Sequence, residues 1–328
     1  MTDKLFSDFQ LGPFRLSSRI VMAPMTRSRA NGNLPNALMA TYYGQRSTAG
    51  LIITEGTAPS LNGLGYSRIP GVFTAAQVAG WRTVTEAVHD RGSRIFVQLM
   101  HTGRIGHPLN LPAGARLVAP SAVVAQGQIW TDQEGLKPHP VPEALTTEEV
   151  QATIGEFVAA ARLAIEAGFD GVELHGANGY LIEQFLNPAS NRRTDAYGGS
   201  VQNRGRFVLE TAAQVAAAIG KERVGVRLSP YGVYNDQPFY ESIDETYAYL
   251  ARELNQLGIA YLHLMNGGVS ESQAATRKLY ATIRKAFGGP IILCGDYDRT
   301  RAEAELQSGL ADQRLEFILG HATILGSL

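Results

Sequence analysis

Short apolar runs alternate along the chain with longer stretches that repeat apolar residues at helical spacing. Runs rich in Val, Ile and Leu are typical of strands that are buried on both faces. We predict such strands at Ile20–Ala23, Leu51–Thr54, Ile95–Leu99, Gly171–Leu174, Val224–Leu228, Tyr261–Leu264 and Ile291–Cys294. The helices predicted between them include Leu38–Ala49, Ala75–Arg91, Thr147–Ala167, Asn203–Ile219, Ile243–Leu257 and Arg299–Ser308.

The alternation of strands and helices indicates repeated βα units around a parallel sheet. Thr146 lies just before one predicted helix whose first turn carries Glu148 and Glu149, and Gly258 follows the end of another. No Gly-x-Gly-x-x-Gly follows the early strands, which counts against a dinucleotide-binding Rossmann domain. Seven strands predict instead an α/β fold, a (β/α)8 TIM barrel whose eighth βα unit is incomplete or altered.

The connection between residues 102 and 145 is long and rich in Gly and Pro. Loops of this length inside a compact domain are usually functional or disordered. We therefore expect a single domain over residues 1–328, with a capping insertion at about 102–145 over the mouth of the barrel. A solvated loop is the alternative for this segment.

Composition narrows the function classes. The chain has 328 residues, 45% of them hydrophobic, and its 29 basic and 30 acidic residues give a formal net charge of −1. This balance gives no reason to expect nucleic acid or an anionic membrane as a partner. The seven His show no zinc-like spacing, so we expect no metal, and the single cysteine, Cys294, lies in a predicted strand. No signal peptide or membrane-spanning run is apparent, and we expect a cytoplasmic monomer or homodimer.

The segment Gly171-Val-Glu-Leu-His-Gly-Ala-Asn-Gly-Tyr180 reads as a buried strand that delivers three polar side chains into one loop. His175 and Asn178 offer two neutral N–H donors, which can converge on an oxygen that gains negative charge. The phenol of Tyr180 can supply a proton nearby. Such a set suits the polarisation and protonation of an unsaturated carbonyl or nitro compound. The alternative for His175 alone is a packed or capping histidine.

Several separated motifs resemble the Old Yellow Enzyme family of flavin-dependent alkene reductases. The resemblance runs from about Leu5 to about Asp312. The motifs are Ser18-Arg-Ile-Val-Met-Ala-Pro-Met-Thr-Arg27, Tyr42-Tyr-Gly-Gln-Arg-Ser-Thr-Ala-Gly-Leu-Ile-Ile-Thr-Glu-Gly56, Val97-Gln-Leu-Met-His-Thr-Gly-Arg104, His175-Gly-Ala-Asn-Gly-Tyr-Leu-Ile-Glu-Gln-Phe-Leu186, Arg193-Thr-Asp-Ala-Tyr-Gly-Gly-Ser200 and Val226-Arg-Leu-Ser-Pro230.

The resemblance implies bound FMN and assigns residues to it. Thr26 would donate near O4 of the ring, Gln98 would serve the pyrimidine edge, and Arg227 would neutralise the N1/O2 region, where the reduced ring is negative. Thr26 stands where another branch of the family tends to carry cysteine, and Met100 stands where the family often has Trp. Main-chain groups that would flank the ring or face the phosphate belong to Ala23, Pro24, Met25, Gly56, Gly295 and Asp296.

The C-terminal segment departs from the family pattern. Family members carry a Gly-Arg-Pro-Phe-like segment after the eighth strand, with the arginine on the phosphate. Here Arg314–Leu319 is a candidate strand, and Gly320-His321 occupies the corresponding place with a weaker phosphate ligand. We therefore expect weaker FMN binding, lower stability, or completion by a partner subunit.

These observations together predict an FMN-dependent ene-reductase. NADPH or NADH would supply hydride, and flavin N5 would pass it to the β-carbon of α,β-unsaturated carbonyl or nitro compounds. Two alternatives stay open: a flavin reductase that acts mainly on nitro compounds or nitrate esters, and a barrel that binds no flavin and has no catalytic activity.

Overall fold

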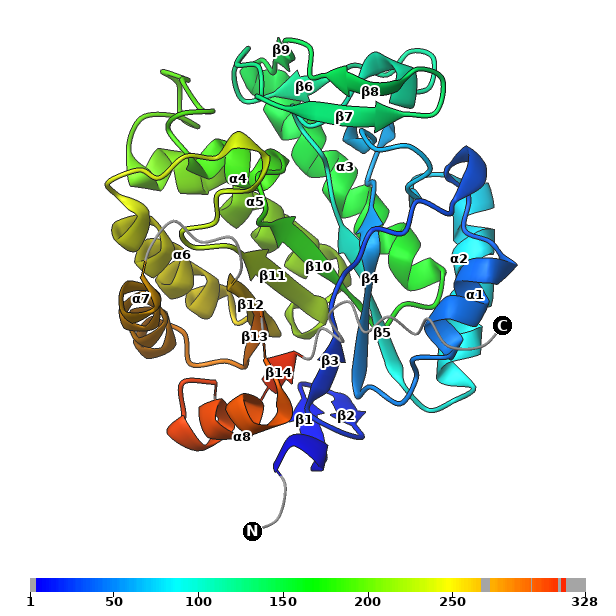
Figure 1. The fold of residues 1–328 in the computed structure, drawn as a ribbon, viewed down its shortest axis with the longest axis vertical. Helices are drawn as coiled ribbons and strands as arrows, with labels where there is room; N and C mark the ends of the chain where they lie inside the picture. The colour runs from blue at the N-terminus through cyan, green and yellow to red at the C-terminus, as the bar shows by residue number, and fades with distance from the viewer. Residues whose placement is uncertain (1–3, 267–271, 296, 312–313, 317–328) are drawn as a thin grey trace.

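Eight parallel strands form a closed barrel in the computed structural model of the chain (Figure 1). The structure describes residues 4–266, 272–295, 297–311 and 314–316. All seven predicted strands are present, and their ends differ from the prediction by at most three residues. The barrel strands are β3 (Ile20–Met22), β4 (Leu51–Thr57), β5 (Arg94–Leu99), β10 (Gly171–Gly176), β11 (Val224–Leu228), β12 (Tyr261–Asn266), β13 (Ile291–Gly295) and β14 (Arg314–Glu316).

The eighth strand, β14, closes the barrel by pairing with both β13 and β3. The TIM-barrel prediction is therefore confirmed, and the candidate strand at Arg314–Leu319 is present over Arg314–Glu316. The remainder of that candidate strand and His321 lie outside the described residues.

Helices surround the barrel on its outer side (Figure 1). Ile243–Leu257 and Arg299–Ser308 have the predicted bounds, whereas the helix predicted at Leu38–Ala49 ends at Gly44, because a turn follows it. The helices are α1 (Ala37–Gly44), α2 (Ala75–His89), α3 (Thr147–Glu166), α4 (Leu181–Leu186), α5 (Val201–Ile219), α6 (Ile243–Leu257), α7 (Gln273–Ala286) and α8 (Arg299–Ser308).

Local signals in the sequence explain where the outer helices begin and end. The Thr146 side chain accepts from the backbone N–H of Glu149, whose carboxylate accepts from the N–H of Thr146, so α3 begins with a capping box. At the C-terminal end of α6, Gly258 adopts the left-handed conformation expected of a glycine that ends a helix. Such caps fix the ends of the helices and therefore the lengths of the adjoining loops.

A hairpin closes the amino end of the barrel. Strands β1 (Phe9–Leu11) and β2 (Phe14–Leu16) pair antiparallel and direct alternate apolar side chains inward. These side chains pack with Phe96, Tyr261 and other inward-facing residues of the barrel strands. The interior at the amino ends of the barrel strands is therefore apolar core, and the polar candidate residues lie toward the carboxyl ends.

The segment between β5 and α3 forms small strands at the opposite end of the molecule from β1 and β2 (Figure 1). Apolar residues of this segment, Ala125 and Ile129, pack against the partly buried rings of Tyr66 and Tyr180. Trp130 on the same segment is exposed. The strands pair β6 (Val118–Ala119) with β9 (Glu143–Ala144), and β7 (Gln128–Thr131) with β8 (Gly135–Pro138).

We predict that Gly225→Ala destabilises the barrel. A Cβ on Gly225 would lie 2.1 Å from Cζ of the buried Tyr261 ring, so the ring must move within a packed interior. Overpacking of this kind costs about 1–3 kcal/mol in the free energy of unfolding, measurable by urea titration. The matched control is Gly155→Ala on the exposed side of α3, where no atom lies within 4 Å; it should stabilise by up to about 1 kcal/mol. Equal effects of the two changes would contradict this account.

Candidate functional site

The candidate residues lie at the carboxyl ends of the barrel strands. Gly56 belongs to β4, Gln98 to β5 and Arg227 to β11, while His175 belongs to β10. Ala23, Pro24, Met25 and Thr26 follow β3 directly, and Gly295 ends β13. Because all barrel strands run parallel, these positions share one mouth of the barrel. Asp296 lies outside the described residues.

A buried ionic network lies between the apolar core and the mouth. The carboxylate of Glu173 on β10 accepts from Gln98 Nε2 at 2.9 Å and lies 2.7 Å from His263 Nδ1. Glu173 and His263 are completely buried. Burial alone raises the pKa of Glu173, but the charge and hydrogen bond of His263 and the charge of Arg227 outweigh it and hold that pKa below its ordinary value. The carboxylate therefore stays ionised and balances the guanidinium of Arg227.

A buried guanidinium needs an anion nearby, and Arg227 has the carboxylate of Glu173 on the adjacent strand. Its register partners are His175 on β10 and His263 on β12, so it lies between the ionic network and the candidate catalytic loop. Its Nη2 approaches two sulfur atoms, Met265 Sδ at 3.2 Å and Cys294 Sγ at 3.1 Å. Sulfur is a weak acceptor, so neither contact neutralises the charge of the guanidinium.

His175 is buried at the carboxyl end of β10. Burial lowers its pKa well below the ordinary value, and the positive charges of Arg227 and His263 lower it further. The imidazole is therefore neutral at physiological pH and donates as a neutral N–H. Among the described residues, no hydrogen-bond partner lies within reach of the buried Nδ1. A buried polar atom without a partner is costly, which favours a ligand at this position.

Asn178 sits in a tight turn with two successive residues in the left-handed conformation. Its φ is +58°, and that of Gly179 is +77°. Asn tolerates this conformation, and a Cβ on Gly179 would lie 2.6 Å from the carbonyl oxygen of Tyr234. The side-chain Oδ1 of Asn178 is buried without a hydrogen-bond partner among the residues that the structure describes. Asn178 Oδ1 is therefore a second buried polar atom, after His175 Nδ1, that has no hydrogen-bond partner among the described residues.

Tyr180 follows the turn, and its ring lies beside His175 with centroids 5.0 Å apart. Its hydroxyl is 3.1 Å from that of Tyr66, and the two rings meet edge to face. Burial raises the pKa of Tyr180, and hydrogen bonds to Tyr66 and Asn235 only partly oppose this. The phenol is therefore protonated at neutral pH.

The backbone after β3 is fixed by a buried carboxylate. Glu55 on β4 accepts from the N–H of Arg27 at 3.2 Å and from the hydroxyl of Tyr43 at 3.1 Å. Burial raises the pKa of Glu55, and these hydrogen bonds oppose that rise. Thr26, immediately before Arg27, is left exposed at the mouth, where its hydroxyl is open to a ligand.

These groups fit an isoalloxazine ring. The mouth offers a permanent cation at Arg227 for the N1/O2 region and the Thr26 hydroxyl for a polar edge. The lack of a side chain at Gly56 lets Met100 pack directly against the backbone of β4, since a Cβ there would lie 2.4 Å from Met100 Sδ. One hydrogen of the Gln98 amide is engaged by Glu173, which orients that amide at the edge of the mouth.

Sequence reasoning missed several residues that hold the site together. A charged residue inside the apolar run of β10 was the available signal for Glu173, and His263 gave the same signal in β12. Ser229 and Asn235, in the loop after β11, hydrogen-bond the backbone of Asn178 at 2.9 and 2.7 Å. Their spacing in the sequence does not predict these hydrogen bonds, because each bond joins segments about 50 residues apart.

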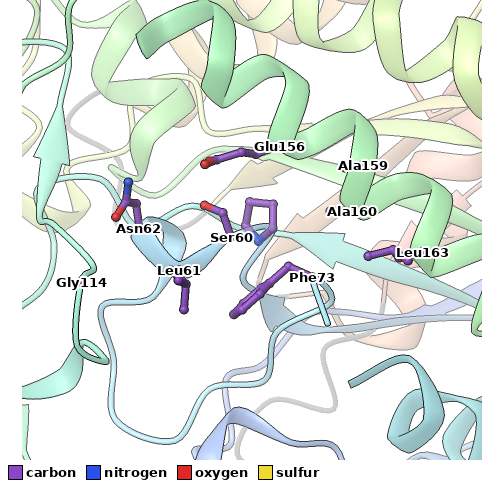
Figure 2. A pocket seen from close by; sticks show the side chains of 10 residues that line it. Ser60, Leu61, Asn62, Phe73, Gly114, Glu156, Ala159, Ala160 and Leu163 are labelled. Atoms are coloured by element: carbon purple, nitrogen blue, oxygen red, sulfur yellow. The ribbon is translucent and has the colours of Figure 1, made fainter. Parts of the chain in front are cut away.

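A separate hollow of about 370 Å³ lies on the outside of the barrel (Figure 2). The α3 side contributes Glu156 and Leu163, and the segment between β4 and α2 contributes Ser60, Leu61 and Phe73. None of the strand-end candidates lines it. This hollow is therefore not the candidate catalytic site.

The described part of the chain contains no group of three or more His, Cys, Asp or Glu residues arranged to hold a metal ion. In the same residues, no helix has both the length and the apolar character that crossing a membrane requires.

Known proteins resemble this chain over nearly all of its length. The NADH:flavin oxidoreductase / NADH oxidase family matches residues 4–313. A probable flavin mononucleotide-dependent alkene reductase of Leishmania infantum is 41% identical over 315 residues, which cover 94% of this chain and 85% of that protein. The Old Yellow Enzyme homologue of Zymomonas mobilis is 41% identical with a TM-score of 0.90, covering 96% of this chain and 88% of that one. The chain belongs to the Old Yellow Enzyme family.

Morphinone reductase, solved in complex with tetrahydroNAD, gives a further similar structure. It is 43% identical with a TM-score of 0.89, and the match covers 95% of this chain and 86% of that one. This Old Yellow Enzyme is accordingly an FMN-dependent oxidoreductase that uses a nicotinamide cofactor as its hydride donor, and its family reduces alkenes.

We predict that Glu173→Gln strongly destabilises this Old Yellow Enzyme. Removing the carboxylate breaks the fully buried pair with His263 at 2.7 Å and takes a negative charge away from Arg227, and breaking a buried pair typically costs about 3–5 kcal/mol. The measurement is the free energy of unfolding from urea titration. Glu86→Gln on the exposed side of α2 is the matched control and should change it by less than about 0.5 kcal/mol. A Glu173→Gln protein as stable as the control would show that the network does not hold the barrel together.

Proposed function

We propose that this protein reduces activated alkenes, with His175, Asn178 and Tyr180 as its catalytic residues and NADPH or NADH as the hydride source. The observation that supports this most directly is the buried His175 Nδ1, which has no hydrogen-bond partner among the described residues. The Asn178 side chain follows in the same loop and carries an N–H donor of its own. A carbonyl or nitro oxygen that accepts from both side chains would supply the partner that His175 Nδ1 lacks.

His175 and Asn178 would act as an oxyanion site. Their N–H groups would bind the oxygen of an α,β-unsaturated carbonyl compound and stabilise the negative charge that grows on it. Neutral donors suit this role, because the pKa of His175 is far too low for an imidazolium to form and give up its proton to the substrate. Binding in a buried position strengthens both hydrogen bonds relative to water.

Tyr180 would protonate the α-carbon of the substrate. Its phenol keeps its proton at neutral pH, since burial raises its pKa, and its ring lies beside the imidazole of His175. The neighbouring hydroxyl of Tyr66, 3.1 Å away, would orient the phenol and relay a replacement proton.

FMN, when bound, accepts hydride from the nicotinamide and supplies it to the β-carbon of the substrate. We propose that Thr26, Gln98 and Arg227, with main-chain groups of Ala23, Pro24, Met25, Gly56, Gly295 and Asp296, hold it. The segment at residues 102–145 would cap the single domain and exclude water from the mouth, since Ala125 and Ile129 pack against Tyr180.

Reduction of nitro compounds is a second candidate activity. A nitro oxygen presents the same acceptor geometry to His175 and Asn178, and it needs no proton on carbon. The two activities are therefore separable by their dependence on Tyr180.

We predict that His175→Ala and Asn178→Ala each lower the kcat for cyclohexenone by about 10²–10³-fold, because each removes one donor to the developing oxyanion. The measurement is steady-state turnover with NADPH, normalised to bound FMN from the flavin absorbance. A colourless protein would instead support the non-catalytic alternative. The assignment fails if the double variant keeps full FMN and wild-type turnover.

We predict that Tyr180→Phe slows alkene reduction and leaves nicotinamide oxidation nearly unchanged, because only alkene reduction needs a proton on carbon. Rapid mixing measures the two half-reactions separately. The flavin absorbance is lost when NADPH reduces the flavin, and it recovers when cyclohexenone reoxidises the flavin. Tyr66→Phe is the matched control, since it removes the neighbouring hydroxyl but keeps the donor; it should slow recovery less. Equal slowing of bleaching and recovery by Tyr180→Phe would rule out the proton-donor role.

A further inference from the structure

The carboxyl group of Glu183 lies directly beneath the turn that carries Asn178. Glu183 belongs to the short helix α4, and its side chain is only 5% exposed. One oxygen, Oε2, accepts from the backbone N–H of Gly179 at 2.5 Å. The other, Oε1, accepts from the hydroxyl of Ser229 at 2.7 Å and from that of Tyr247 at 2.9 Å. Three donors therefore converge on one buried carboxyl group.

The contact through Ser229 extends to Asn178 itself. The Ser229 hydroxyl oxygen accepts from the backbone N–H of Asn178 at 2.9 Å while its proton points to Glu183. The carboxyl group thus holds both amides of the left-handed turn, that of Gly179 directly and that of Asn178 through one hydroxyl. Left-handed residues are strained outside glycine, so the turn needs such anchors to persist.

The surroundings of the carboxyl group favour its neutral form. Tyr247 from α6 contacts it, Tyr240 from the segment before α6 also faces it, and Ser229 covers it from the loop after β11. No ion pair to Glu183 occurs among the described residues. Burial raises the pKa of Glu183 to about 7, and the hydrogen bonds from Ser229, Gly179 and Tyr247 limit that rise.

We propose that the ionised carboxylate of Glu183 is a positioning residue that holds the Asn178–Gly179 turn in its substrate-binding geometry, and that protonation of this carboxyl group loosens the turn. The inference rests on the proposed function, because it assigns to Asn178 the substrate oxygen. Glu183 touches neither substrate nor flavin and acts only through the turn.

Hydrogen-bond arithmetic gives the direction of the effect. A carboxylate accepts at both oxygens and satisfies all three donors. A protonated carboxyl group must donate once, so one of Gly179, Ser229 or Tyr247 loses its acceptor or has to rotate. When the lost contact is that of Gly179 or Ser229, the turn is released. The active geometry is therefore complete above about pH 7 and is lost as the pH falls through that value.

The direct test observes the Gly179 amide by NMR as the pH is varied. Labelling the carbonyl carbon of Asn with ¹³C and the amide of Gly with ¹⁵N selects the four Asn-Gly pairs of the chain, at residues 31–32, 62–63, 178–179 and 266–267. We expect the Gly179 signal to titrate with a midpoint near pH 7 in the wild type and to be flat in Glu183→Gln. The Gly63 amide, which donates to the carbonyl of Ser60, is the internal control. A Gly179 signal that does not titrate between pH 5.5 and 8.5 overturns the proposal.

The functional test compares the pH dependence of kcat/KM for cyclohexenone. The kcat/KM of the wild type should fall by up to about tenfold per pH unit below the midpoint. The kcat/KM of Glu183→Gln should not depend on pH and should be about 10- to 100-fold below the wild type at pH 8, which is the loss expected for a misplaced substrate-binding group. Glu183→Asp, which keeps a carboxyl group, should restore a pH step. Glu166→Gln at the exposed end of α3 is the matched control and should follow the wild type.

A double-mutant cycle separates positioning from general loss of structure. If Glu183 acts on Asn178 through Ser229, the losses from Glu183→Gln and Ser229→Ala should be clearly less than multiplicative. A wild-type pH profile in a folded Glu183→Gln protein overturns the proposal. A protein without alkene reductase activity at any pH refutes the proposed function instead, and the Gly179 titration still decides the structural role of Glu183.

Discussion

The site depends on one buried charge, the guanidinium of Arg227 near the mouth of the barrel. A guanidinium cannot lose its proton, so burial requires a compensating anion, and Glu173 supplies it from the adjacent strand. His263 and Gln98 hold that carboxylate in place. Burial lowers the pKa of His175, and the positive charge of Arg227 lowers it further, so the same guanidinium contributes both to the expected flavin environment and to the neutral state of the proposed oxyanion donor.

The geometry of the catalytic loop follows from a second constraint, the left-handed turn at Asn178 and Gly179. Such a turn directs a side chain away from the path of the strand, and hydrogen bonds to its backbone hold it in place. Glu183 supplies one from the following helix, and Ser229 and Asn235 supply others from the loop after β11. The loop is therefore held both locally and by the neighbouring βα unit, so its geometry depends on the closed barrel as well as on its own sequence.

The sequence predicted the barrel well because each strand and helix carries its own periodic pattern. The strand-end positions of His175, Gln98 and Arg227 followed directly from parallel topology. The contacts of Glu183 with Ser229 and Tyr247, and that of Tyr180 with Tyr66, were not predictable, since they join segments that only the folded barrel brings together. The early end of α1 was missed for a different reason: the sequence offers Gly50 as a helix stop, whereas the helix ends at Gly44 and residues 45–48 form a turn.

The catalytic turn needs the ionised form of Glu183, whereas the folded protein stabilises the neutral form. Its pKa is raised in the folded protein from an ordinary value near 4.5 to about 7, so the folded state holds this proton more tightly than the unfolded chain. Its contribution to stability is therefore fully present below pH 4.5 and is lost as the pH rises through 7, a change on the order of 3 kcal/mol. The ionised form that satisfies the three donors is thus the form that the fold stabilises least. A carboxyl group retained at such a cost under the catalytic turn is better explained by positioning than by packing, because a buried apolar side chain would serve the core without that penalty.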